Sequence, residues 1–240
     1  MANINLIRTI IGIIGNCISC GLFLSPLPTF YNIYKNKSVG DYSPNPYLCT
    51  ILNCLLWVYY GLPFVHAHST LVITINGFGC VIEFIYVCIF FAYATFGAIT
   101  KKGRGYMLLV LAVIAVFYTA VVLLLSLEPH SVKNRPKIIG IVCDIVNICM
   151  YAMPLDNLYM VITTKSSESL PKWLLLFNAL NGGCWLTYGL LPFDIYLVVS
   201  NGLGFVLGII QIIVWWWFNN PKPKNQVGDP KIAAKELSMV

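Results

Sequence analysis

Long apolar stretches alternate with short polar segments along the whole chain. Seven of them are long enough to cross a membrane as helices, which takes roughly 17 to 25 residues each. They lie near residues 6–30, 46–63, 70–93, 106–127, 138–162, 172–191 and 195–218. None has the alternating pattern of a barrel strand, and a helix is the other way to satisfy every backbone amide in lipid. The pattern therefore predicts an all-α integral membrane protein with seven transmembrane helices.

Composition and the start of the chain agree with this prediction. Hydrophobic residues make up 58% of the 240 residues and charged residues only 10%, whereas roughly 25% of the residues in soluble domains are charged. The first stretch has no basic flank before it, lacks a small-x-small cleavage site and is too long for the apolar region of a signal peptide. We therefore count it as a true span.

The same pattern of residues occurs twice. Five positions recur 128 residues later with the same amino acid: Pro26, Asn53, Trp57, Tyr60 and Gly61 match Pro154, Asn181, Trp185, Tyr188 and Gly189. Two further pairs are 125 residues apart, Pro46 with Pro171 and Asn76 with Asn201. This indicates an internal duplication with a small shift in the loops, and a functional site is expected between the copies.

The odd number of spans determines how the copies are oriented. Spans one to three and five to seven form the repeats, and the fourth span returns the chain to its starting side, so both copies point the same way. We predict two parallel triple-helix bundles in a 3+1+3 arrangement. The expected units are residues 1–97, a linker with the fourth span at 98–132, residues 133–218, and a disordered cytosolic tail at 219–240.

The distribution of basic residues favours an N-terminus outside the cell. In that orientation eleven of the 15 Lys and Arg residues fall on the cytosolic side: Lys35, Lys37, Lys101, Lys102, Arg104, Lys165, Lys172, Lys222, Lys224, Lys231 and Lys235. The outside keeps Arg8, Lys133, Arg135 and Lys137, in line with the positive-inside rule. The net charge of +6 therefore reflects topology, and no basic stripe interleaved with aromatics suggests a nucleic-acid partner.

The sequence offers no catalytic or metal-binding motif. All nine cysteines lie in apolar spans, and Cys17 and Cys20 are interpreted as packing residues despite their CxxC spacing. His66, His68 and His130 lie in expected outer loops without a metalloprotease, hydrolase or phosphate-binding motif. His66 and His68 are spaced like a chance surface pair. We predict no enzyme activity, disulfide, metal or cofactor.

The duplicated polar residues point to a neutral polyol. An amide offers a donor and an acceptor that can bridge vicinal hydroxyls, and an indole presents a flat apolar face to the C–H face of a sugar ring. The duplicated set is Asn53 with Asn181, Asn76 with Asn201, and Trp57 with Trp185. A single Asn or Trp in a span would more simply be a packing or interface residue, but groups repeated about a pseudo-twofold axis converge on one cavity.

The duplicated prolines lie at one end of the spans. Pro26 and Pro154 fall near the cytosolic ends of spans one and five, where an interior proline removes a backbone hydrogen bond and kinks the helix. Pro46 and Pro171 open spans two and six on the same side, where proline starts a helix well. The four are expected to form a hinge set.

The chain resembles the SWEET family of sugar transporters over nearly its whole length. The matching segments are GNCISCGLFLSPLPTFYNIYKNKS, LNCLLWVYYGLPF, TLVITINGFGCVIE, MYAMPLDNLYMVITTKS and FDIYLVVSNGLGFVLGIIQ. The resemblance implies a bidirectional, facilitative uniporter in which two triple-helix bundles rock around a central sugar, and it implies a homo-oligomer in a lipid bilayer.

The resemblance also implies roles for single residues. Asn76 and Asn201 match the family's sugar-binding asparagines, and Trp57 and Trp185 its stacking residues. The cytosolic proline tetrad corresponds to Pro26, Pro46, Pro154 and Pro171, and the extracellular gate pair to Tyr60 and Asp194, which a phenol-to-carboxylate hydrogen bond can close.

Substrate size follows from the same resemblance. Members that prefer disaccharides carry small residues at four positions, which here are Leu22, Asn53, Met150 and Asn181. Larger side chains leave a smaller cavity, so glucose-like hexoses are expected over sucrose.

The expected location is the plasma membrane, with a vacuolar or other internal membrane as the alternative.

Several alternatives stay open at this point. Asp144 and Glu83 lie inside spans, and intramembrane acids are functional candidates, so proton-coupled transport is one alternative. Neither acid is duplicated, which favours a structural role with a hydrogen bond to a neighbouring Tyr or Asn. Sucrose preference is a second alternative, and an organellar PQ-loop transporter a third, although Pro-Leu replaces the Pro-Gln signature. A seven-span receptor is the last, but it needs no duplicated amides and indoles.

Overall fold

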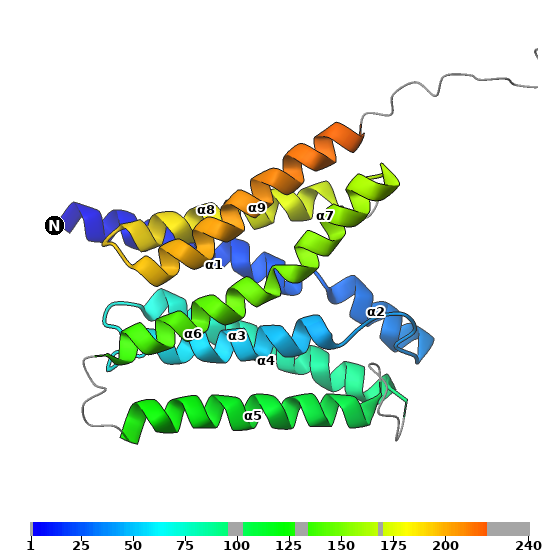
Figure 1. Ribbon diagram of the computed structural model, residues 1–240, viewed down its shortest axis with the longest axis horizontal. Coiled ribbons are helices and arrows are strands. Elements are labelled where there is room, and N and C mark those ends of the chain that lie inside the picture. The colour runs from blue at the N-terminus through cyan, green and yellow to red at the C-terminus, as the bar shows by residue number, and fades with distance from the viewer. Residues whose placement is uncertain (1, 96–102, 128–133, 168–169, 220–240) are drawn as a thin grey trace, which may run out of the picture.

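The computed structural model describes residues 2–95, 103–127, 134–167 and 170–219. These residues form nine helices (Figure 1): α1 (Ala2–Leu24), α2 (Leu27–Asn36), α3 (Asn45–Gly61), α4 (Thr70–Tyr93), α5 (Arg104–Leu127), α6 (Arg135–Met150), α7 (Ala152–Thr164), α8 (Lys172–Leu190) and α9 (Ile195–Asn219). The all-α prediction is confirmed. The first and fifth predicted spans are each divided into two helices, α1 with α2 and α6 with α7.

Some expected features fall outside the described residues. They are His130, the loop lysines Lys101, Lys102 and Lys133, and the tail beyond residue 219. Within the described part, five segments are long and apolar enough to cross a membrane by length and composition: Asn3–Asn36, Thr70–Tyr93, Arg104–Leu127, Arg135–Thr164 and Ile195–Asn219. The second and sixth predicted spans, α3 with 17 residues and α8 with 19, are shorter.

The helices pack as two similar halves. In the first half α4 packs against α1, α2 and α3, and in the second half α9 packs against α6, α7 and α8. The halves meet in two equivalent contacts, α1 with α8 and α6 with α3, while α5 packs on α3. This arrangement is the 3+1+3 pattern expected from the duplication. We call the end that holds Ala2 and Gly61 the N-terminal face, and the end that holds Asn36 and Asn219 the C-terminal face (Figure 1).

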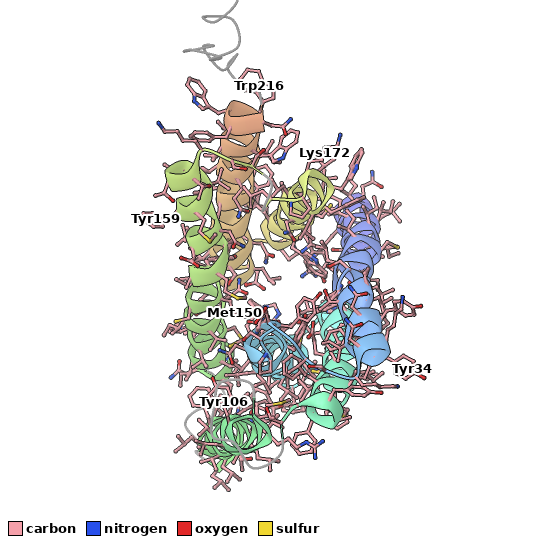
Figure 2. All side chains as sticks on the ribbon, turned by 90° about the vertical axis from the view of Figure 1, so that its right-hand side faces the viewer. Tyr34, Tyr106, Met150, Tyr159, Lys172 and Trp216 are labelled. Carbon is pink, nitrogen blue, oxygen red and sulfur yellow. The ribbon has the colours of Figure 1, made fainter. Side chains whose placement is uncertain are left out.

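The apolar core is shared at the N-terminal face and divided at the C-terminal face. One cluster joins both halves through residues such as Trp57, Tyr60, Trp185 and Tyr188. Two separate clusters lie nearer the C-terminal face, one around Phe30 and Phe90 with α5, the other around Val161, Leu170 and Leu175. Seen from that face, Tyr34 of α2 and Tyr159 of α7 lie on opposite sides (Figure 2). The halves are therefore closed at the N-terminal face and apart at the C-terminal face.

The first helix break lies at Pro26. The helix α1 ends at Leu24 and α2 begins at Leu27, because proline lacks the amide hydrogen that would continue the ladder. At this break, two side-chain hydroxyls donate hydrogen bonds to backbone carbonyls. Ser25 donates to the Leu22 carbonyl at 2.7 Å, and Tyr86 of α4 donates to the Phe23 carbonyl at 3.0 Å.

The second break lies one turn before its proline. The helix α6 ends at Met150 and α7 begins at Ala152, so the break falls at Tyr151 and Pro154 is the third residue of α7. Pro154 cannot donate to the Met150 carbonyl, which is four residues earlier, and its ring crowds that carbonyl. The expected flexure point at Pro154 is therefore displaced to Tyr151. Pro46 is the second residue of α3, and Pro171 immediately precedes α8.

Two glycines allow each break to approach its neighbouring helix. A Cβ added at Gly79 of α4 would lie 2.5 Å from the Phe23 ring, and one at Gly204 of α9 would lie 2.6 Å from the Tyr151 hydroxyl. Gly79 and Gly204 are 125 residues apart, and Phe23 and Tyr151 are 128 apart. The duplication therefore extends to this close contact, although Phe23 and Tyr151 differ in type.

Candidate functional site

A cavity of about 170 Å³ lies between the two halves, on the C-terminal side of the shared core. Its lining takes polar, aromatic and aliphatic residues from both copies: Phe23, Asn53, Trp57, Val72, Ile75, Asn76, Asn147, Asn181, Trp185, Leu197 and Asn201. Six of the eight residues predicted to bind substrate are among them. The other two, Leu22 and Met150, do not line this cavity; they lie at the ends of α1 and α6, beside the helix breaks, where Figure 2 labels Met150.

The two indoles are held in equivalent positions. Trp57 packs edge-on against Tyr60 with a centroid distance of 5.3 Å, and Trp185 packs in the same way against Tyr188 at 5.2 Å. Each pair lies three residues apart on its helix, which places both rings on one side. The tyrosines belong to the shared core, and the indoles line the cavity. The Trp–Tyr pairs therefore connect the cavity to the contact that closes the N-terminal face.

The duplicated asparagines of α4 and α9 are held by their own helices. The Asn76 amide donates to the Val72 carbonyl and the Asn201 amide to the Leu197 carbonyl, both at 2.9 Å. Each bond uses one of the two amide hydrogens and fixes the side chain. Among the described residues, the carbonyl oxygen and the second hydrogen of each side chain make no other hydrogen bond, which suits a ligand that both donates and accepts.

The asparagines of α3 and α8 differ in their partners. Ser19 of α1 donates to the Asn181 side-chain oxygen at 2.5 Å and accepts the Trp185 indole hydrogen at 3.1 Å. The equivalent oxygen of Asn53 is buried and has no hydrogen-bond partner in the described part of the chain. A buried acceptor without a partner costs free energy unless a ligand or water satisfies it. The first half therefore contributes an acceptor, the Asn53 oxygen, to which a ligand hydroxyl could donate a hydrogen bond.

This difference comes from the position equivalent to Ser19. That position is Asn147 of α6. Its amide donates a hydrogen bond to the Tyr151 hydroxyl at 3.1 Å and not to the Asn53 oxygen. The sequence analysis missed Ser19, Asn147 and Phe23, because it looked for identical residues in the two copies. Listing residues 128 apart that differ in type but share polarity would have found Ser19 and Asn147.

The two residues of the predicted gate pair contact each other at the N-terminal face. The Tyr60 hydroxyl donates to the Asp194 carboxylate and lies 2.9 Å from both oxygens. Asp194 also caps α9, since one of its oxygens accepts the backbone N–H of Tyr196 at 3.1 Å and of Leu197 at 3.3 Å. The phenol and the carboxylate come from different halves and are both buried, so their bond ties the halves together.

The interpretation of His66 as part of a chance surface pair is wrong. The His66 ring stacks on Tyr60 with a centroid distance of 4.8 Å, and its Nε2 lies 3.6 Å from Asp194. Its Nδ1 lies 2.7 Å from the Ser69 hydroxyl. Burial lowers the pKa of His66 below its usual value, and the charge of Arg8 acts in the same direction while Asp194 opposes it. Loop residues gave no sequence signal for this contact, because it exists only when the halves meet.

The two intramembrane acids lie outside the cavity lining. Asp144 of α6 accepts a short hydrogen bond from the Ser200 hydroxyl of α9, so its partner is a serine and not the Tyr or Asn that the sequence suggested. Glu83 of α4 is buried, and one of its carboxylate oxygens has no hydrogen-bond partner among the described residues. In the same part of the chain, no group of three or more His, Cys, Asp or Glu side chains is placed to hold a metal.

Comparison with known proteins gives one family. A family profile described as a sugar efflux transporter for intercellular exchange matches residues 9–97 and 137–223, one match in each half. The bidirectional sugar transporter SWEET7b of Oryza sativa subsp. japonica is 46% identical over 245 residues, covering 100% of this chain and 91% of that protein. SWEET7 of Arabidopsis thaliana, also named a bidirectional sugar transporter, is 48% identical over 214 residues, covering 89% of this chain and 81% of that protein.

A solved structure gives the same result for the fold. A eukaryotic SWEET transporter determined at 3.7 Å resolution superimposes with a TM-score of 0.79 and 33% sequence identity. The match covers 90% of this chain and 98% of that one. The predicted seven-helix membrane fold is thereby confirmed.

Proposed function

Because this chain belongs to the SWEET family of sugar transporters, we propose that it moves sugar across a membrane by facilitated, bidirectional uniport. The family consists of transporters, so the chain is not an enzyme, as predicted from its sequence. Its relatives are named as sugar transporters, and their names specify no particular sugar. The substrate and the mechanism are inferred below from the cavity.

The observation that carries the proposal is the paired lining of the cavity. Two indoles and two helix-anchored asparagines come from equivalent positions of the two halves, and the buried Asn53 oxygen lacks a partner. A sugar ring satisfies this set, because its C–H faces fit against the indoles and its hydroxyls pair with the amides. The Asn53 oxygen then offers a hydroxyl an acceptor with no partner among the described residues, whereas the Asn181 oxygen already accepts from Ser19.

The proposed substrate is a hexose such as glucose. The cavity of about 170 Å³ lies below the roughly 300 to 1,000 Å³ that pockets for drug-sized ligands have. The amides of Asn53 and Asn181 line it where smaller side chains would leave more space. A single sugar ring therefore fits this cavity better than two linked rings.

The proposed mechanism is alternating access around the cavity. The N-terminal face is closed by Tyr60 and Asp194, and the halves are apart at the C-terminal face. Transport requires the opposite arrangement as a second state, with the breaks near Pro26 and Tyr151 as flexure points. We assign the N-terminal face to the outside of a plasma membrane, which places Lys35, Lys37, Lys165 and Lys172 in the cytosol.

The test is counterflow into proteoliposomes that contain the purified protein, with labelled glucose, fructose and sucrose. We expect glucose to accumulate transiently and sucrose to do so far less. The variants Asn76→Ala and Asn201→Ala each lose this flux, whereas Asn32→Ala, an exposed asparagine of α2, retains it as the matched control. Wild-type flux in both cavity variants would refute the assignment of the site, and sucrose flux above glucose flux would refute the hexose preference.

The same liposomes separate uniport from proton coupling. An uncoupled carrier only equilibrates its substrate, so an imposed pH gradient leaves the final glucose distribution unchanged. Accumulation driven by the gradient in the wild type and its loss in Asp144→Asn would replace uniport by proton-coupled transport.

A further inference from the structure

Arg8 of α1 is a buried cation at the N-terminal face. Its side chain is 8% exposed, and its guanidinium lies 4.1 Å from the centroid of the Tyr188 ring. It donates to the His68 carbonyl at 3.0 Å and to the Tyr188 carbonyl at 3.4 Å. An arginine that only anchors a helix at the membrane surface extends its charge into water, whereas this one is directed into the protein.

The contacts of Arg8 cross the boundary between the halves. Arg8 and His68 belong to the first half, and Tyr188 belongs to the last turn of α8 in the second half. The Tyr188 carbonyl is one of the last in its helix, where the helix dipole favours a positive charge. The Tyr188 hydroxyl also donates to the His68 carbonyl, at 3.4 Å. The three residues therefore form one group that ties α8 to α1 and to the loop before α4.

Among the described residues, no carboxylate pairs with this cation. Within the described residues, the His66 ring lies 3.6 Å from Asp194, and no acidic side chain lies within 4.0 Å of the Arg8 guanidinium nitrogens. The guanidinium is held instead by the Tyr188 ring and by two carbonyls. The Tyr188 ring and the Tyr188 carbonyl are lost together if α8 moves away from α1. The charge then keeps only the His68 carbonyl of its own half, and water must replace the other two partners.

Tyr188 is the equivalent of Tyr60, which gives the contact a counterpart. Tyr60 of the first half is held by Asp194 of the second, and Tyr188 of the second half is held by Arg8 of the first. Each half thus supplies one tyrosine and one charged residue to the closed face. We propose that Arg8 is a second gate residue, which must release the ring and carbonyl of Tyr188 before the N-terminal face can open.

This proposal rests on the alternating-access mechanism proposed above. The variant that tests it is Arg8→Gln, which removes the charge and the stacking group but keeps a hydrogen-bond donor. Arg104→Gln is the matched control. Arg104 also donates to two carbonyls at the end of a helix, those of Phe91 and Ala92, and lies 5.3 Å from the Phe91 ring, but these contacts stay within the first half and α5.

The measurement is hydrogen–deuterium exchange of the full chain in lipid nanodiscs without sugar. Opening of the N-terminal face exposes the amides of residues 188–198, where Leu191, Asp194 and Val198 donate to the Tyr188, Gly189 and Asp194 carbonyls. We expect Arg8→Gln to raise exchange there about tenfold, the population change that about 1.4 kcal/mol produces. Exchange in α2 and α7 is expected to fall, because the C-terminal face closes when the N-terminal face opens.

Each outcome has one meaning. Faster exchange at the N-terminal face together with slower exchange at the C-terminal face supports the gate role, provided that Arg104→Gln shows neither. Faster exchange at both faces shows that Arg8 only stabilises the fold. Unchanged exchange shows that Arg8 does not stabilise the closed state of the N-terminal face. Either result overturns the proposal. The experiment contains no sugar, so a wrong substrate assignment would appear in counterflow by the wild type and not here.

Discussion

The hydrogen bond between Tyr60 and Asp194 gives the most direct prediction for the gate. Tyr60→Phe removes the hydroxyl without changing the ring that packs against Trp57 and His66. Although the hydroxyl lies 2.9 Å from both carboxylate oxygens, it has one proton, so one charge-assisted bond is lost. Such bonds contribute about 1.5 to 3 kcal/mol.

This loss affects the two states unequally. In the closed state Asp194 is buried and keeps only its bonds to the first turn of α9 and its contact with His66. In the open state water takes the place of the phenol, so the variant loses little there. The ratio of open to closed molecules therefore rises by about ten- to hundredfold, since about 1.4 kcal/mol corresponds to a factor of ten.

Cys143 of α6 provides a native reporter for this change. Its side chain is fully buried in the shared core next to Tyr60. The assay is modification by a membrane-impermeant methanethiosulfonate reagent added at the N-terminal face, with the modified peptide identified by mass spectrometry because eight other thiols are present. Tyr60→Phe is expected to be modified at Cys143 faster than the wild type by the factor given above.

The neighbouring tyrosine serves as the control. Tyr59 is also buried, and the hydrogen bond that its hydroxyl makes among the described residues is to Ser126 of α5, at 3.5 Å, and not to the second half. Tyr59→Phe should therefore leave Cys143 as protected as in the wild type. If Tyr60→Phe leaves the modification rate unchanged, or if Tyr59→Phe raises it as much, the reasoning about the gate is refuted.

Three further predictions concern packing, pH and substrate size. Gly204→Ala places a methyl group 2.6 Å from a tyrosine hydroxyl, which costs about 1 to 3 kcal/mol and lowers the melting temperature, whereas Gly202→Ala, with its nearest neighbour at 3.6 Å, leaves it unchanged. Burial lowers the pKa of His66 in the closed state, so the closed state binds the proton less tightly than an open state does. The stability of the closed state relative to the open one is therefore highest above about pH 6.5 and falls as the pH drops below that value. Exchange at the N-terminal face therefore rises on acidification, and it does not in His66→Gln. The double variant Asn53→Ser, Asn181→Ser enlarges the cavity, so the ratio of sucrose to glucose counterflow rises severalfold.

Each of these predictions has a result that contradicts it. Equal melting temperatures for the two glycine variants would mean that α9 moves aside without cost. An acid-induced opening of the same size in His66→Gln would assign the titration to another group. A double variant that still excludes sucrose would place the size limit elsewhere, with the aromatic Phe23 of the cavity lining as the nearest candidate.

The arrangement of the helices follows from the sequence because it depends on a periodic signal. Apolar stretches of membrane length and a register of 128 residues are sufficient for two parallel bundles and a returning fourth span. The position of a helix break is less visible. At Pro26 the break coincides with the proline, but in the second half it lies at Tyr151, because a proline disturbs the turn that precedes it.

The site could be predicted only where the two copies have kept the same residue. Asn76 and Asn201 were visible as a pair, and they make the same backbone contact. Ser19 and Asn147 occupy equivalent positions with different side chains, so identity gave no signal, yet they decide which asparagine oxygen is left for a ligand. Arg8 and His66 act across the closed face, and contacts between residues far apart in sequence depend on how the halves meet.

The differences between the copies give the closed face its stability. An identical pair of tyrosines held by two carboxylates would place two negative charges in a buried interface, and two arginines would place two positive ones there. Here Tyr60 is held by Asp194 and Tyr188 by Arg8, so these two contacts bring one charge of each sign. Like charges repel in a medium of low polarity and opposite charges do not, and the duplicated tyrosines therefore close the face together only because their partners have diverged.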